Sequence, residues 1–377
     1  MKLIDIECDI DRLHINQATL SDAMKQALHA DNESLFGLLE FTNDYVFLEP
    51  TLLCYFLSSL ETAKKITLQQ ILYGYVELIK KPAKLKLKSD LFGFANIPNV
   101  GYVKMEPFQE QEWHMHQLVE SVVKSTFVEQ SSVRLCMHPT DELALARDVF
   151  FDESTAQTFQ RNKLPLEEAC GFLQKWATPF WELIESVTRE FVVFSSPNQN
   201  SFASISHHGT AYFNTENKNQ TAVFFVDDIS HQCGHVIFNA LTLDTDRYLK
   251  VAKDNPLSEF IENKNDTRGV YGALHGLFTY TCILYSLDKL LASNWNENYK
   301  REAVGRLGFY MNKFRMDLIN MDNPKILTEE GMSFHEQFQE SYNYIFERYR
   351  EQIMSFDFSN QPYTFQYDLF KKANPIR

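Results

Sequence analysis

NQTAVFFVDDISHQCGHVIFNALTL, residues 219–243, is the stretch that decides the fold of this chain. Its apolar residues recur at helical spacing over about six turns, and Asn219 or Thr221 supplies an N-cap. His231 and His235 are four residues apart, so a helix carries both imidazoles on one face, about one turn apart. We expect the helix to be buried because of its apolar neighbours, which are Ile229, Val236, Ile237, Phe238 and Leu241.

The histidine pair has the spacing of two ligands of one metal ion. A buried imidazole needs a polar partner, and an ordinary hydrogen-bonded pair of histidines is the alternative that the spacing leaves open. His275 lies in TRGVYGALHGLFTY, residues 267–280, which predicts a second apolar helix. Gly272 and Gly276 beside it are expected to let another helix approach closely. His275 is therefore a candidate third ligand, and a core histidine satisfied by a carbonyl is its alternative.

The stretches on either side of the histidine helix predict the fold class. EFVVFSS (190–196) and SFASISHHGTAYFNT (201–215) are rich in β-branched and aromatic residues and predict a small sheet, with a turn at Gly209. Helical spacing downstream covers residues 266–293, 296–321 and 328–353. The chain is predicted to be mainly α, a helical protein with a small β element preceding a metal-binding helix pair.

The N-terminal part has mainly helical periodicity. Its predicted elements are helical stretches in 33–65 and 67–81, a loop near 89–104, a helix around 112–125, and a long helix over 165–191 that Pro165 opens. We therefore divide the chain into a helical N-terminal region, residues 1–180, and a metal-binding region, residues 181–377, which are expected to pack as one unit.

Composition limits the function classes. The 377 residues carry a net charge of −14, which disfavours nucleic acid and anionic membrane surfaces as partners. The six cysteines are scattered with no C-x-x-C pair, as is typical of free thiols in a reducing compartment. No uninterrupted apolar run reaches the roughly 18 residues of a membrane span, so we expect a cytoplasmic protein.

Four stretches occur in order between residues 191 and 334: SFASISHHGTAYFN, VDDISHQCGH, DTRGVYGALHGLFTY and LTEEGMSF. In this order they resemble the bacterial HExxH-motif proteins found beside ribosomally made, modified peptides. That group includes iron- and 2-oxoglutarate-dependent peptide β-hydroxylases. The resemblance implies that His231 and His235 are metal ligands and that His275 occupies the place of the third.

The sequence departs from the family at Gln232, where glutamate is usual. A zinc peptidase uses that glutamate as its general base, so Gln232 is unfavourable for proteolysis. An Fe(II)/2-oxoglutarate oxygenase needs no such base, but it needs three protein ligands on one face and open positions for the keto acid and O₂. Asp227 and Asp228 either supply a carboxylate ligand or orient the imidazoles.

The distal carboxylate of 2-oxoglutarate needs a cation, and arginine matches a carboxylate with two hydrogen bonds. Arg268 is the first candidate, because the predicted helix also carries His275. Arg306 and Arg315 on the following helix are the others. For each of the three, a surface or interhelical ion pair is the alternative.

These features together predict an Fe(II)- and 2-oxoglutarate-dependent hydroxylase that uses O₂ on the β-carbon of a residue in a ribosomal precursor peptide. A zinc-dependent hydrolase with another base and a non-catalytic peptide-binding scaffold are the rival functions. His207 and His208 are expected in an exposed turn, with an approach to the metal site as the alternative, and no role is assigned to His114 and His116.

Overall fold

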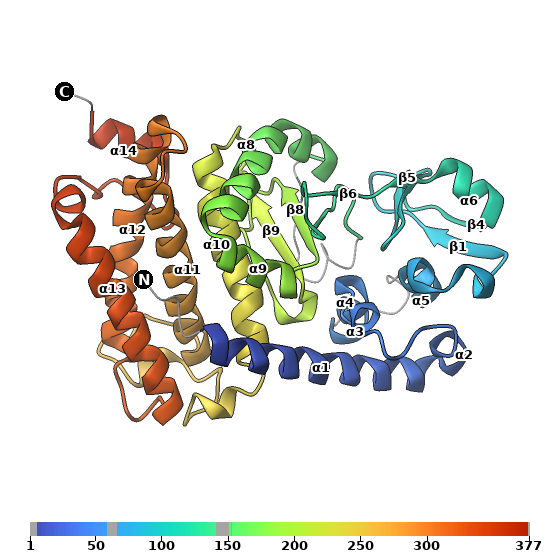
Figure 1. Ribbon diagram of the computed structural model, residues 1–377, viewed down its shortest axis with the longest axis horizontal. Helices are drawn as coiled ribbons and strands as arrows, with labels where there is room; N and C mark the ends of the chain where they lie inside the picture. The colour runs from blue at the N-terminus through green and yellow to red at the C-terminus, as the bar shows by residue number, and fades with distance from the viewer. Residues whose placement is uncertain (1–5, 59–65, 141–150, 152, 376–377) are drawn as a thin grey trace. The chain divides into compact units, whose positions relative to one another are not determined.

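The computed structural model describes residues 6–58, 66–140, 151 and 153–375 (Figure 1). The chain forms two compact units, and each is built from separate segments. Unit 1 comprises residues 1–12, 168–182 and 221–377, and unit 2 comprises residues 13–167 and 183–220. The chain passes from unit 1 to unit 2 between residues 182 and 183, near the predicted boundary between residues 180 and 181. The division into those two functional regions stays a prediction.

Unit 1 is helical. Helix α11 (Val270–Ala292) packs against α10 (Ala222–Leu241), α12 (Glu297–Met321) and α13 (Glu329–Met354), and α14 (Tyr367–Ala373) packs on α12. Thr221 caps α10, and its hydroxyl accepts a hydrogen bond from the Phe224 amide at 3.0 Å. The predictions of this cap and of the four long helices are confirmed.

Unit 2 holds the sheet that precedes the histidine helix. Its strand order is β6 (Thr126–Phe127), β7 (Arg134–Leu135), β8 (Glu190–Phe194) and β9 (Thr210–Asn214). Strands β7, β8 and β9 run parallel, and Val192 lies opposite Tyr212 in the register. Gly209 has a φ of +93° directly before β9, so the predicted turn is confirmed. The first half of residues 201–215 contributes only a single bridge, from Phe202 to Tyr212, and no further strand.

Apart from α1 (Ile6–Asp31) and α8 (Thr155–Trp176), the remaining elements of unit 2 are short. Two further sheets pair β1 (Lys84–Lys88) with β4 (Glu110–His114), and β2 (Phe94–Ile97) with β3 (Gly101–Lys104) and β5 (Val123–Lys124). The other helices with residues in this unit are α2 (Glu33–Phe36), α3 (Asp44–Phe47), α4 (Pro50–Leu57), α5 (Leu68–Leu72), α6 (Met115–Ser121) and α9 (Thr178–Val187). In the described residues, the helical stretches predicted in 33–65 and 67–81 are therefore only short helices, α2 to α4 in the first and α5 in the second.

The predicted loop at 89–104 is wrong, and the predicted helix around 112–125 is confirmed only for α6, Met115–Ser121. Strands β2 and β3 form a hairpin within the first, and the second begins with the end of β4. In β1, Lys84 and Lys86 pair with Glu112 and Glu110 of β4, while Leu85 and Leu87 face the core. Helical spacing is a local signal, and cross-strand partners of this kind overrode it.

The predicted helix over 165–191 is replaced by α8 and α9, with a break at Ala177. Pro165 lies inside α8, where it cannot donate the helical hydrogen bond to residue 161, and does not open the helix. His207 and His208, expected in an exposed turn, are buried at 0% and 1% exposure.

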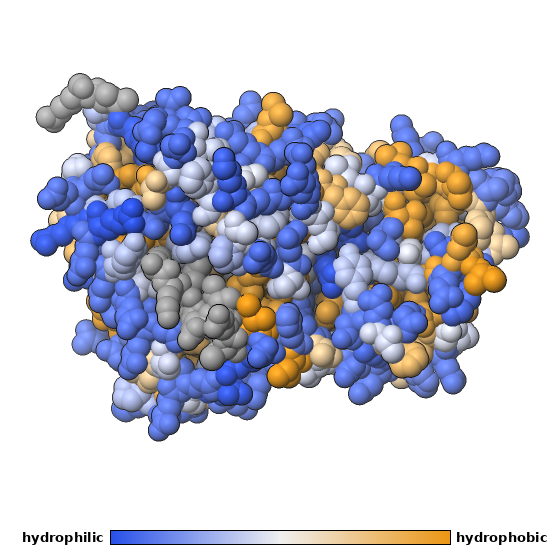
Figure 2. All heavy atoms as spheres, viewed as in Figure 1, coloured by the Kyte–Doolittle hydropathy of each residue, from blue (hydrophilic) through white to orange (hydrophobic). Residues whose placement is uncertain are grey.

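The fold class is confirmed as mainly α with small β elements. No helix in the described part of the chain is long and apolar enough to cross a membrane. Apolar side chains gather on the surface over α6 and β5 (Figure 2), where Val119 and Val123 are 71% and 62% exposed.

Candidate functional site

The three predicted histidines lie together in unit 1. His231 and His235 lie one turn apart on α10, with ring centroids 4.9 Å apart. His275 comes from α11, and its ring centroid is 4.3 Å from that of His235. The Nδ1 atom of His235 is 2.9 Å from Nε2 of His275, within hydrogen-bond distance. Residues that are 40 positions apart in sequence therefore meet at one place.

A glycine on α10 sets the close packing of these two helices. A Cβ atom on Gly234 would lie 3.3 Å from both the Cys282 sulfur and a Thr279 methyl group on α11. Gly272, which we expected to permit the approach, faces open space, and a Cβ on Gly276 would meet only ordinary contacts. A glycine does permit the close approach of the two helices, as we expected, but it is not one of the two glycines beside His275. The residue that matters lies between the two histidines of α10.

Burial keeps His231 and His275 neutral. It lowers the pKa of His231 to about 4, with a smaller contribution from Lys313, and lowers the pKa of His275 to about 3. Neutral imidazole is the form that binds a metal ion. Two neutral imidazoles, together with the His235 ring between them, therefore suit a transition metal in their chemistry.

The same geometry also satisfies the histidines without an ion. Nε2 of His275 is 3.2 Å from the backbone oxygen of His235, in addition to the contact with the His235 ring. Among the described residues, no three or more histidine, cysteine or carboxylate side chains are arranged as a metal site. A bound ion would take the place of the hydrogen bond between His235 and His275.

The polar side chains next to the histidines on α10 have different hydrogen-bond partners. Gln232 is buried and donates to Oδ1 of Asp228 at 3.0 Å, and its own Oε1 has no hydrogen-bond partner among the described residues. Asp227 is 2% exposed and accepts from Arg306 at 2.8 Å. Burial raises the pKa of Asp227, and Arg306 opposes that effect. Asp228 therefore orients Gln232, while Asp227 links α10 to α12.

The arginines proposed for the keto acid are engaged by carboxylates or exposed. Arg268 precedes α11, contrary to its predicted place on that helix, and contacts Asp317 at 2.7 and 2.8 Å and also Asp266. Arg306 is buried between Asp227 and Glu302. Arg315 is exposed. For Arg306 the structure shows the interhelical ion pair that was the alternative, and for Arg268 it shows ion pairs from the segment before α11.

Sequence reasoning missed Lys313. Its ammonium donates a hydrogen bond to the backbone oxygen of Tyr363, lies 3.9 Å from the centre of the Tyr363 ring, and is close enough to His231 to affect the pKa of that imidazole. Burial lowers the pKa of Lys313 to about 8. The signal was available: Lys313 is seven residues after Arg306, so the two share one face of α12.

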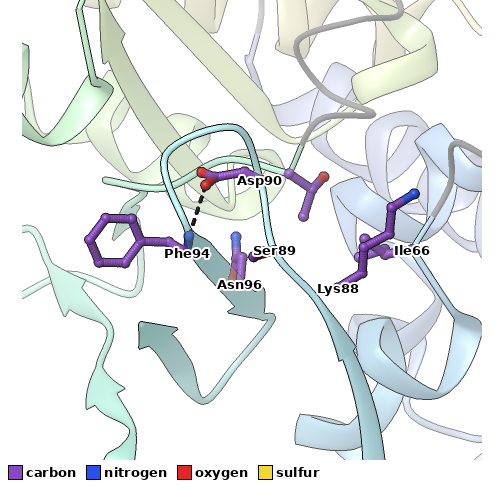
Figure 3. Close-up of a pocket in the computed structure, with 7 residues that line it drawn as sticks. Ile66, Lys88, Ser89, Asp90, Phe94 and Asn96 are labelled. Carbon is purple, nitrogen blue, oxygen red and sulfur yellow. Dashed lines mark hydrogen bonds between the residues drawn. The ribbon is translucent and has the colours of Figure 1, made fainter. Parts of the chain in front are cut away.

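A small cavity lies elsewhere, in unit 2 (Figure 3). It is lined by Ile66, Lys88, Ser89, Asp90, Phe94, Asn96 and Thr140, and has room for about one water molecule. Asp90 accepts a hydrogen bond from the Phe94 amide at 2.8 Å at its edge. None of the predicted site residues lines this cavity, which we regard as a packing feature.

No family of known proteins matches the chain, and no curated protein matches it at a significant level. The resemblance to HExxH-motif proteins therefore stays a prediction that rests on the four stretches of sequence.

Proposed function

We propose that this protein is an Fe(II)- and 2-oxoglutarate-dependent oxygenase that hydroxylates the β-carbon of a residue in a ribosomally made precursor peptide. The observation that carries the proposal is the meeting of three histidines from α10 and α11. His231, His235 and His275 would hold the iron. Bound iron with the keto acid supplies the oxidising power drawn from O₂.

The residues around the histidines support this role by holding α10 in place. Arg306 joins Asp227 of α10 to Glu302 of α12, and Glu302 also accepts from the Thr221 hydroxyl at the start of α10. Ligand helices must be fixed to within a fraction of an ångström if the donor atoms are to converge. Gln232 is neutral and cannot act as the base of a peptidase, which favours oxygenation over hydrolysis.

Metal content and turnover test the proposal. The purified protein is titrated with Fe(II) without oxygen, and then supplied with 2-oxoglutarate, O₂ and a precursor peptide encoded near its gene. We expect about one iron per chain, succinate release, and a peptide heavier by one oxygen atom. His231→Ala and His275→Ala should lose iron binding. His335→Ala is the matched control, because His335 is a buried histidine in unit 1 that instead contacts the Leu318 backbone oxygen at 2.8 Å.

A non-catalytic scaffold is the second candidate. The hydrogen bond between His235 and His275 favours it, since the two rings satisfy one another without metal. In that case Fe(II) and Zn(II) would both fail to bind, and His275→Ala would lower stability with no effect on metal content. Zinc-dependent cleavage of the peptide would instead support the hydrolase that Gln232 disfavours.

A further inference from the structure

One face of α12 carries a row of polar side chains, and two of them lie near the histidine helix. Arg306, Tyr310, Lys313 and Asp317 are spaced by three or four residues, so they follow one another along that face. Arg306 contacts Asp227 of α10, and the Tyr310 ring centroid is 6.4 Å from that of His231. Lys313 is one turn beyond Tyr310.

The cations in and beside this row differ in the number of carboxylates that they contact. Arg306 and Arg268 each contact two carboxylates within 3.0 Å. Lys313 has no carboxylate within ion-pair distance among the described residues, and its partners are the Tyr363 backbone oxygen and the rings of Tyr363 and Phe309. An ammonium has three hydrogen-bond donors, so two remain for a ligand. Lys313 is thus a half-buried cation one turn beyond Tyr310 that lacks a direct ion pair in this part of the chain, while Asp227 and Asp317 act on its charge from farther away and oppose the effect of burial on its pKa.

We propose that Lys313 binds the carboxylate of an acidic ligand at the histidine cluster. The inference rests on the proposed function, and there the ligand is the keto acid, with Lys313 in the role that the sequence suggested for an arginine. Like a guanidinium, the ammonium forms charge-assisted hydrogen bonds, although it acts as a point charge without the two-pronged geometry of arginine.

The C-terminal segment is part of this site. Phe358, Phe365 and Phe370 pack against α12 at Gly305 and Gly308, where a Cβ atom would lie 3.0 Å or less from their rings. That packing holds Tyr363 above Lys313, and the Tyr363 side chain is itself 74% exposed. A bound carboxylate replaces or supplements the Tyr363 oxygen as the partner of the ammonium.

Calorimetry with 2-oxoglutarate tests the role of Lys313 in the full chain, both metal-free and loaded with Fe(II) under argon. Lys313→Gln should weaken binding about tenfold or more, as expected for a lost charged hydrogen bond, and Lys313→Arg should recover most of it. Lys250→Gln is the matched control, because Lys250 also donates to a backbone oxygen, that of Pro324 at 2.9 Å, yet has no histidine partner. Its dissociation constant should equal that of the wild type.

Thermal melting separates binding from a purely structural role. If Lys313 only anchors the C-terminal segment, Lys313→Gln lowers the melting temperature and leaves the 2-oxoglutarate affinity unchanged, which overturns the inference. An absence of 2-oxoglutarate binding to the wild type in both forms overturns it as well. Lysine-dependent binding without succinate formation upholds the inference while the proposed function fails. Succinate formation with unchanged affinity in Lys313→Gln upholds the proposed function while the inference fails.

Discussion

Replacement of Arg306 by methionine tests the buried charge network that joins α10 to α12. The guanidinium contacts Asp227 at 2.8 Å and Glu302 at 2.8 Å, and both carboxylates are 2% exposed. Methionine fills similar space but leaves two buried acids without their cation. Breaking a buried ion pair from one side costs about 3–5 kcal/mol. That loss is a large part of the roughly 5–15 kcal/mol that stabilises a typical domain.

Urea unfolding followed by far-ultraviolet circular dichroism measures this cost. Arg315→Met is the control, because Arg315 is an exposed arginine on the same helix, and it should change the free energy of unfolding by less than about 0.5 kcal/mol. The double variant Arg306→Met with Asp227→Asn should lose less than the sum of the single variants, since one of the orphaned charges is removed with its partner. A free energy of unfolding for Arg306→Met within about 1 kcal/mol of the wild type would refute the reasoning.

Three further predictions concern packing, pH and the altered motif. Gly234→Val should destabilise the protein by about 1–3 kcal/mol in the same urea unfolding experiment, because the new side chain meets Cys282 of α11. Gly272→Ala is its control and should be neutral or stabilising, because Gly272 faces open space. Burial lowers the pKa of His208 from 6.5 to about 4, so the unfolded chain binds a proton there that the folded chain does not. The stability that neutral His208 contributes should be full above pH 6.5 and fall by about 2 kcal/mol by pH 5, so His208→Gln should lose about 2 kcal/mol less than the wild type over this range. The same pH dependence in the wild type and in His208→Gln would contradict this. Gln232→Glu should not create a peptidase, and Gln232→Ala should keep measurable hydroxylation in the succinate and mass assays; efficient zinc-dependent cleavage by Gln232→Glu, with no oxygen insertion by the wild type, would exclude the oxygenase.

The helices of unit 1 were predictable because their signals are local. Thr221 as a cap and the spacing of His231 and His235 need no knowledge of the rest of the chain. The meeting with His275 was predictable from the resemblance, together with the apolar character of both helices. Residues 84–124 were harder, because β1 and β4 depend on partners more than twenty residues away.

The arginines show a second limit. Sequence identifies Arg268 and Arg306 as cations near the site, but Asp317 and Asp227 neutralise them only once α12 is packed in place. Lys313 is a candidate ligand-binding residue because no carboxylate lies within ion-pair distance of it in the described part of the chain. A pattern in one segment cannot reveal the absence of a partner from another.

The segmented make-up of the two units has a consequence for biosynthesis. All residues of unit 2 have been made once residue 220 is added, whereas unit 1 needs residues from both ends of the chain. At about 5–20 residues per second, a ribosome takes roughly 10–30 s to add residues 221–377. Residues 1–12 therefore wait for their partners while unit 2 is already free to fold. A single cut in the gene cannot separate the units, and helices α10 to α14 of unit 1 are made only after the last residue of unit 2.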